Sequence, residues 1–516
     1  MQPSEAPVNQ SQAPSPIRPA HRLTLLLLLG ACIAVRFLHL DSKPYWFDEC
    51  FSVEVARIGW SSFLRLLWWR EANMALYYVL LRIWLNFGQG EFFIRSLSAL
   101  IAAATLPAVY WLTRLLYDRR VALIATALFT FNAYSVRYAQ EARSYALFLL
   151  LATLSSGFLI AFLREPTRHN WRGYVLFSIL AVYAHFYALL LIVVQGLSLR
   201  KLGKSLHDTE MVRSSQMWRA WMVIGVAVLP LLVFVAKTGA GPIRWISRPG
   251  LHDVLAFYEH LAGSNQWILP VLFAVMCVAA IVPVGKRLWT SNENWETWRS
   301  RFLLIWLFFP VALTLVLSLA RPVFLGRYMI FCLPPLLILA AAGLSRLRNP
   351  WLLGTALSGV LLLGLQGIGF VYGRDFDNER DASGAASAFI LDHARPGDAV
   401  IFHIAATRVA YEFFRSERAG EDTASPRFTA QFGPEILFPR HGTGLDYRDF
   451  TGKPTPDLLR AAALVHPRLW VMLMNNGSEE NPDATTLMLS QVLSESFPRN
   501  QQWKFTKVEV RLYSKE

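Results

Sequence analysis

Apolar segments about as long as a membrane is thick recur along the first part of this chain and then stop. A helix needs about 20 mainly apolar residues to span a bilayer, and segments of this kind recur from Leu23 to Val371 but not beyond. Hydrophobic residues make up 54% of the 516 residues and charged residues only 17%, which is too apolar for an ordinary soluble protein. The sequence therefore predicts an α-helical polytopic membrane protein with a soluble C-terminal domain.

Three regions follow from this pattern. Residues 1–20 are rich in Pro, Ser and Gln, which predicts a disordered cytoplasmic tail. Residues 21–371 are expected to form the transmembrane domain, and residues 372–516 a small α/β domain in which a helix at Ala382–His393 precedes strands. The strand candidates are Asp398–His403, Leu469–Met474 and Thr506–Tyr513.

Basic residues indicate how the chain threads the membrane. They occur in short clusters between apolar spans, such as Arg119 with Arg120 and Lys201 with Lys204, rather than along one amphipathic face that would suggest nucleic acid. Because Lys and Arg are retained in cytoplasmic loops, the clusters fit about eleven spans, with the N-terminus inside and residues 372–516 outside. The path requires two short helices within Tyr174–Leu199, with an outside turn near His185.

The first external loop has a different character. The segment Phe51–Leu85 is apolar but contains charged residues and several tryptophans. Trp-rich amphipathic helices prefer the membrane interface to the hydrocarbon core. We therefore expect a pair of helices lying on the outer membrane surface.

On this path, four groups of unusual polar residues fall on the outer face. They are Tyr45–Glu49, Gln140–Tyr145, Tyr183–Tyr187, and Arg321–Pro322 together with Gly326–Tyr328. Asp48 and Glu49 stand beside aromatic residues at the membrane surface, where a carboxylate is costly, so Asp48 is either a functional base or the N-cap of the helix that follows.

The other polar residues also have two interpretations. Glu141 and Arg143 could form a loop ion pair, Arg327 could be an interface anchor, and His185 could be a satisfied turn histidine. As a set on one face, however, they combine arginines, which suit phosphate through bidentate hydrogen bonds, with carboxylates, which suit deprotonation of a hydroxyl.

These segments carry a resemblance to a known family. The matching stretches, in order, are YWFDECFSVEVAR, LYYVLLRIW, VRYAQEARSYAL, RPVFLGRYMIFCLPPLLILAAAGL and, in the tail, RDASGAASAFILDHARPGDAVIF. Together they resemble the polytopic C-type glycosyltransferases of bacterial membranes (glycosyltransferase family 39), which are related to protein O-mannosyltransferases and to the lipid A aminoarabinose transferase. The resemblance spans residues 22 to about 415. It departs at Asn73–Ala75, where many relatives have His-Pro-Pro.

The resemblance implies roles for the residues that match. Asp48 would be the catalytic base, with Glu49 and Glu141 as further acidic residues of the site, and Arg143 and Arg327 would contact the phosphate of the carrier. The remaining residues expected to contact the substrate are Tyr145, His185, Tyr187 and Tyr328.

The implied reaction moves a sugar from a polyprenyl-phosphate carrier to an acceptor hydroxyl of a lipid, glycan or protein, with inversion, at the external face of a bacterial inner membrane. It requires no cofactor. A divalent ion between Asp48 and Glu141 would be compatible with it, but no metal-ligand spacing points to one. The alternatives are a polytopic transporter or flippase of a lipid-linked sugar, and a membrane-anchored binding or scaffold protein. A transporter would carry ionisable groups near the bilayer midplane, whereas the later spans have uncharged middles.

Overall fold

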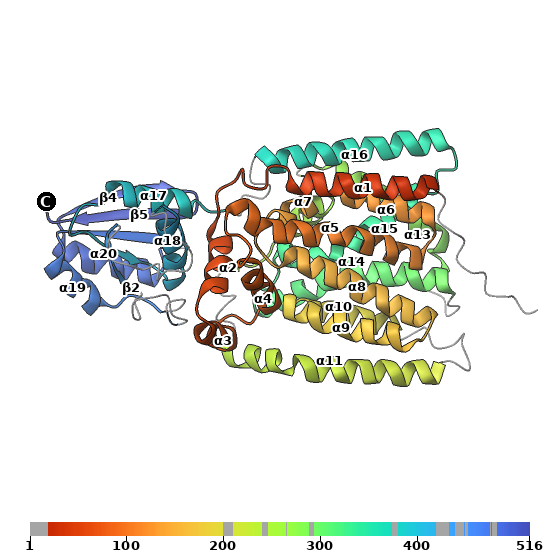
Figure 1. The fold of residues 1–516 in the computed structure, drawn as a ribbon, viewed down its shortest axis with the longest axis horizontal. Helices are drawn as coiled ribbons and strands as arrows, with labels where there is room; N and C mark the ends of the chain where they lie inside the picture. Colours follow the sequence, from red (N-terminus) through yellow and green to blue (C-terminus); the bar gives the residue numbers. More distant parts are fainter. Residues whose placement is uncertain are drawn as a thin grey trace, which may run out of the picture.

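The computed structural model describes residues 19–199, 210–239, 246–264, 266–287, 294–373, 380–418, 433–438, 448, 452–474, 476 and 482–516. Figure 1 shows a long bundle of helices, with a smaller domain containing a sheet at one end of it. Residues 1–18 of the expected tail and the basic cluster at Lys201 and Lys204 lie outside the described residues.

Every expected span coincides with a helix of the bundle. These helices are α1 (Pro19–Phe37), α5 (Glu91–Leu116), α6 (Arg119–Thr130), α8 (Tyr145–Arg164), α9 (Arg168–Ala184), α10 (Ala188–Leu199), α11 (Glu210–Thr238), α13 (Ile268–Ile281), α14 (Trp295–Ala320), α15 (Leu333–Leu344) and α16 (Pro350–Gly373). Shorter elements connect them, namely α7 (Ala133–Ala139), α12 (Leu251–Leu261), η3 (Val282–Val284) and η5 (Gly326–Cys332). The expected pair of short helices within Tyr174–Leu199 is confirmed as α9 and α10, and His185 lies in the turn between them.

Six of the described helices are long and apolar enough to cross a membrane. They include Gly326–Leu344, where 94% of the residues in the apolar stretch are buried, and α16, where the share is 22%. Helix α16 lies at the edge of the bundle. Helices α6 and α7 do not form one continuous span. Helix α6 ends at Thr130, and Asn132 then starts α7 by accepting a hydrogen bond from the Ser135 amide at 2.8 Å.

Small residues let the helices approach closely. A Cβ added at Gly343 of α15 would overlap the backbone carbonyl of Met276 on α13, and one added at Gly157 of α8 would overlap the Trp111 ring on α5. Close backbone approach of this kind drives helix association where apolar burial alone provides no preference. These two glycines thus allow α15 to pack closely on α13, and α8 on α5.

The loop that follows α1, which the sequence predicts to be external, forms three helices, so the expected pair was wrong. They are α2 (Phe47–Arg57), α3 (Trp60–Trp69) and α4 (Ala75–Trp84). The chain is extended at Ile58 and Gly59, which separates α2 from α3. Trp60, Trp68 and Trp69 of α3 are exposed, as the interfacial interpretation predicts, whereas most of α2 is buried.

The C-terminal domain is the expected small α/β unit. Its helices are α17 (Ser383–His393), α18 (Ala405–Arg418), α19 (Pro456–Val465) and α20 (Ala484–Ser496), and its strands are β1 (Ala399–Phe402), β2 (Glu435–Phe438), β3 (Arg468–Met474), β4 (Arg499–Phe505) and β5 (Val508–Ser514). The sheet order is β2-β1-β3-β5-β4, with β2, β1 and β3 parallel and β5 and β4 antiparallel.

Helices cover both faces of this sheet. In β1, Ala399 and Ile401 face α19 and α20, while Val400 and Phe402 face α17 and α18. This explains why β1 is buried on every residue, since a strand with both faces covered has no solvent side. Helix α18 also contacts α2, which joins the domain to the bundle.

The threading of the chain can be tested directly. A reporter that is active only outside the cytoplasm should work when fused after residue 380 and fail when fused after residue 205, because the basic clusters alternate along the chain. The measurement is reporter activity in intact cells, with equal expression of both fusions as the control. An inactive fusion after residue 380 would contradict the external position of the C-terminal domain.

Candidate active site

The predicted polar groups meet at the end of the bundle that faces the C-terminal domain. Helix α2 carries Asp48 and Glu49 in its first turn. The turn after α7 supplies Arg143, the α9–α10 turn supplies His185, and η5 supplies Arg327. Segments far apart in the chain therefore come together at one place.

Asp48 faces two arginines. Its Oδ2 lies 3.7 Å from Arg143 Nη2 and 3.6 Å from Arg327 Nη2. Arg143 also donates to the Asp48 backbone carbonyl at 3.3 Å and to Ser52 Oγ at 3.2 Å. Two guanidinium groups from different segments of the chain therefore lie beside this carboxylate. Among the described residues, however, no group donates a hydrogen bond to the buried Oδ2.

The N-cap interpretation of Asp48 is wrong. Trp46 occupies the N-cap position of α2 and makes no capping hydrogen bond with its side chain, while Asp48 lies inside the first turn. A carboxylate there is still favoured by the helix dipole. Its side chain nevertheless points to the arginines rather than to the free amides of its own helix.

Glu49 is held much more tightly than Asp48. Its two carboxylate oxygens accept hydrogen bonds from Arg95 Nε at 2.8 Å and Nη2 at 2.7 Å, and the Ala142 amide donates to Oε1 at 3.0 Å. Burial raises the pKa of Glu49, but Arg95 and these hydrogen bonds outweigh it and hold the pKa below its ordinary value. The geometry favours a positioning role, because Glu49 ties α2 to α5 and to the turn after α7.

Glu141 is also buried and held by arginines. It lies 3.4 Å from Arg137 Nε and 3.7 Å from Arg380 Nη2. The expected loop ion pair with Arg143 is replaced by these contacts, since Arg143 turns toward Asp48. Glu141 thus lies behind Asp48, next to the start of the C-terminal domain.

His185 is neutral and presents one nitrogen to the site. Burial, aided by the positive charges of Arg143 and Arg327, lowers its pKa to about 3. The Tyr187 amide donates to Nδ1 at 3.2 Å, so the proton of the neutral ring is on Nε2. Among the described residues the buried Nε2 has no hydrogen-bond partner. The satisfied-histidine interpretation therefore holds for one nitrogen only.

Aromatic rings surround His185. Its ring stacks on Phe148 at 5.1 Å and lies 4.7 Å from Tyr328 and 5.3 Å from Tyr187. The Tyr187 hydroxyl donates to the Val323 carbonyl and is thus already used. His185 therefore forms one aromatic cluster with the predicted substrate residues Tyr145, Tyr187 and Tyr328.

Three further donors near the site lack partners within the described part of the chain. They are Tyr145 Oη, Tyr78 Oη and Trp46 Nε1, all buried. Leaving a buried donor unpaired costs about 1–3 kcal/mol, so such a group in a native structure calls for an explanation. The sequence reasoning missed Tyr78 and did not single out Trp46, although both stand in the matching motifs.

Glu71 is a carboxyl that the sequence reasoning did not assign to the site. It lies in the loop between α3 and α4, where Met74 adopts a positive φ of 67° and Asn73 Oδ1 accepts a hydrogen bond from the Phe186 amide at 3.1 Å. This bond holds the loop against the His185 turn. Burial raises the pKa of Glu71 to about 7, opposed by Arg143 and reinforced by Asp48.

Asn73 accounts for the departure from the relatives' His-Pro-Pro. Its side-chain oxygen accepts a hydrogen bond from a backbone amide of another loop, and the side chain is not an ionisable group.

The described residues contain no group of three His, Cys, Asp or Glu side chains placed to hold a metal ion. The carboxylates of Asp48 and Glu141 face arginines instead.

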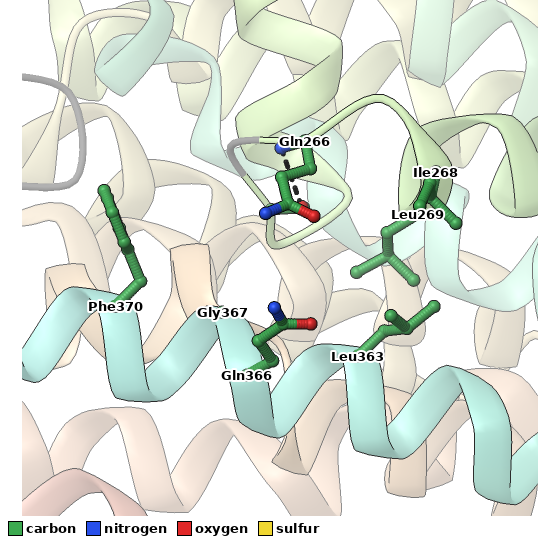
Figure 2. A pocket seen from close by; sticks show the side chains of 8 residues that line it. Gln266, Ile268, Leu269, Leu363, Gln366, Gly367 and Phe370 are labelled. Carbon is green, nitrogen blue, oxygen red and sulfur yellow. Dashed lines mark hydrogen bonds between the residues drawn. The ribbon is translucent and has the colours of Figure 1, made fainter.

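A separate cavity of about 190 Å³ lies between α16 and the segment that leads into α13 (Figure 2). It is lined by Ser264, Gln266, Ile268, Leu269, Leu363, Gln366, Gly367 and Phe370. The Gln266 amide donates to Ser264 Oγ at 2.9 Å. None of the predicted site residues lines this cavity, so it is not part of the site around Asp48.

The fold can be compared with those of known proteins. The chain has the fold of the polytopic C-type membrane glycosyltransferases, as the motif resemblance predicts. It is similar to ArnT from Cupriavidus metallidurans in the apo state, with a TM-score of 0.59 and 12% identity over 96% of this chain and 99% of that one. It is also similar to ArnT bound to undecaprenyl phosphate, with a TM-score of 0.51 and 13% identity over 95% and 97%.

Sequence comparison alone gives no such relation. No protein-family model matches the chain, and no curated protein matches it. At 12–13% identity the structural likeness establishes the fold, while activity depends on the chemistry of the site.

The position of Glu71 predicts a pH dependence of stability. A carboxyl whose pKa is higher in the folded than in the unfolded state contributes stability at low pH that is lost as the pH rises through its folded pKa. For Glu71 that loss falls between its ordinary value of 4.5 and about 7. Glu71→Gln cannot ionise, so it should lose less thermal stability than the wild type between about pH 5 and about pH 8.

The measurement is the unfolding temperature in detergent across this range. A residual slope is expected in the variant, because burial also raises the pKa of Glu412 in α18 to about 7. The matched control is Glu165→Gln, at an exposed position, which should keep the wild-type slope. Parallel curves for Glu71→Gln and the wild type would show that Glu71 does not titrate in this window.

Proposed function

We propose that this protein is a membrane glycosyltransferase that moves a sugar from a polyprenyl-phosphate carrier to an acceptor hydroxyl at the external face of a bacterial inner membrane. The observation that carries the proposal is the Asp48 carboxylate, which faces two arginines from other segments. Beside it are buried hydrogen-bond donors that have no partner among the described residues. The fold shared with ArnT supports it. The acceptor is a lipid, a glycan or a protein.

The arginines suit the carrier phosphate. Arg143 and Arg327 approach the same point from the turn after α7 and from η5, and their planar guanidinium groups can bind phosphate oxygens in pairs. They lie at 3.6–3.7 Å from Asp48, longer than a charge-assisted hydrogen bond of about 2.7–2.9 Å. A phosphate could therefore recruit them without breaking a tight pair. The ArnT structure with undecaprenyl phosphate supports a lipid carrier.

The unpartnered donors suit the sugar. Tyr78 Oη, Tyr145 Oη, Trp46 Nε1 and His185 Nε2 are buried hydrogen-bonding groups around the carboxylate and the arginines. Sugar hydroxyls accept and donate hydrogen bonds, and aromatic rings pack against the apolar faces of sugar rings. Because His185 is neutral, its Nε2 proton is available at physiological pH without adding charge.

The proposed reaction is a direct displacement. The acceptor hydroxyl oxygen forms a bond to the anomeric carbon, the bond from that carbon to the phosphate oxygen breaks, and the bonding electrons leave with the carrier phosphate. Asp48 takes the hydroxyl proton through Oδ2, and the arginines stabilise the charge that develops on the phosphate. Attack opposite the leaving phosphate inverts the anomeric centre, and the step requires no cofactor.

The same two arginines link donor binding to the base. Arg143 and Arg327 both face Asp48 Oδ2. A phosphate that engages these guanidinium groups is therefore held beside the carboxylate that takes the acceptor proton.

Arg327 provides a test of donor binding. Arg327→Lys keeps the positive charge but loses the planar fork, so the affinity for undecaprenyl phosphate should fall by about tenfold or more. The measurement is carrier binding to the purified protein. Arg321→Lys, at an exposed position shortly before η5, is the matched control and should bind normally. Unchanged affinity in Arg327→Lys would reduce Arg327 to an interface anchor.

Asp48 provides a test of the chemical step. Asp48→Asn keeps the size of the side chain but cannot accept a proton at working pH, so sugar transfer should fall at least about a hundredfold while donor binding persists. The measurement is the rate of carrier release by the purified variant. Asp41→Asn removes an exposed carboxyl that precedes α2 and should transfer normally. If Asp48→Asn transfers at a near wild-type rate, another carboxyl, such as Glu71, would have to be the base.

A further inference from the structure

The first described residues of the C-terminal domain lie next to two buried carboxylates of the site. Arg380 is only 7% exposed. Its Nη1 lies 3.8 Å from Glu49 Oε2 and its Nη2 lies 3.7 Å from Glu141 Oε1. One guanidinium group of the external domain thus spans two carboxylates that belong to two different segments of the membrane domain.

This position has an electrostatic consequence. Glu49 and Glu141 are both fully buried, and like charges in a buried site repel strongly. Each carboxylate has an arginine of its own, Arg95 and Arg137 respectively. Only Arg380 contacts both among the ion pairs of the described residues, so it offsets the repulsion between α2 and the turn after α7.

The next residue, Asp381, caps the helix that carries Asp48. The first amides of a helix need acceptors, and the N-cap residue of α2, Trp46, supplies none from its side chain. Asp381 supplies an acceptor for one of these amides. Its Oδ2 and Oδ1 accept from the Phe47 amide at 3.1 and 3.4 Å. The same side chain accepts from the Ser383 amide at 3.0 Å at the start of α17.

Helix α18 supports α2 from the same side. The Phe413 ring packs edge-on against Tyr45 at 5.1 Å, and the Arg57 guanidinium lies 5.7 Å from the centre of the Phe413 ring. The external domain therefore contacts α2 before its start, at its first turn and at its end.

We propose that Arg380 and Asp381 are positioning residues that make the external domain part of the active site. They fix the first turn of α2 and so hold the Asp48 carboxylate toward Arg143 and Arg327. The consequence for catalysis rests on the proposed transferase function, whereas the effect on α2 does not.

Hydrogen exchange of the α2 amides tests the positioning without an activity assay. Asp381→Ala removes the cap and should raise exchange in the first turn of α2 about fivefold, while Asp381→Asn, which can still accept, should stay near the wild type. Peptides from β3 and β5 report whether the domain remains folded. Arg499→Gln, at an exposed position of β4, is the charge control and should change nothing.

Arg380→Gln should also raise α2 exchange and lower the turnover number at least about tenfold, with a smaller change in donor affinity. Because its effect arises from carboxylate repulsion, it should largely disappear in a Glu141→Gln background, whereas loss of packing would simply add. Arg380→Lys keeps the charge but places it on one nitrogen, so the exchange of the α2 amides should lie between that of the wild type and that of Arg380→Gln. This variant replaces Arg380→Gln in the test if Arg380→Gln fails to fold.

Three results would overturn the proposal. They are wild-type α2 exchange in Asp381→Ala, wild-type exchange in both Arg380 variants, and additive effects of Arg380→Gln and Glu141→Gln. If the wild-type protein releases no free carrier phosphate from any sugar donor, the transferase function is contradicted instead. The hydrogen-exchange results would still decide whether Arg380 and Asp381 position α2.

Discussion

The structure depends on the requirement that charges buried at the end of a membrane bundle must be paired. Glu49 with Arg95 is the central pair, because its bidentate contact and the Ala142 amide join α2, α5 and the turn after α7. An unpaired charge at this depth would be strongly destabilising. The site around Asp48 forms on this scaffold, and so does the attachment of the C-terminal domain through Arg380.

Two neighbouring carboxylates in the first turn of α2 have contrasting surroundings, which suits the two different roles proposed for them. Glu49 is fully buried with short hydrogen bonds to both oxygens, which suits a fixed structural anion. Asp48 faces its arginines at longer distances and has an oxygen with no donor among the described residues. A group that must accept a proton and release it needs this looser environment, and a rigid neighbour keeps it in place.

Much of this arrangement could be predicted from the sequence, because apolar length and charge alternation act locally. The main helices of the bundle, the turn at His185 and strands β1, β3 and β5 of the C-terminal domain follow from such patterns, whereas β2 and β4 were missed. The contribution of Arg95 was missed, although a charged residue at the start of an apolar span is a usable signal. Arg380 and Glu71 could not be placed, since their roles depend on contacts with segments far away in the chain. The first loop was predicted as two helices because the spacing of its tryptophans does not reveal that the chain is extended at Ile58 and Gly59, between α2 and α3.

The proposed function requires that the site break the bond between a sugar and its lipid phosphate. The most direct measurement is to incubate the purified protein in lipid nanodiscs with a panel of undecaprenyl-phosphate sugars and candidate acceptors, and to follow the carrier by mass spectrometry. At least one donor should be converted to free undecaprenyl phosphate, with the sugar recovered on an acceptor in the inverted configuration. If every donor stays intact in nanodiscs, while the same protein in vesicles moves a donor from one leaflet to the other, the protein is a flippase and not a glycosyltransferase.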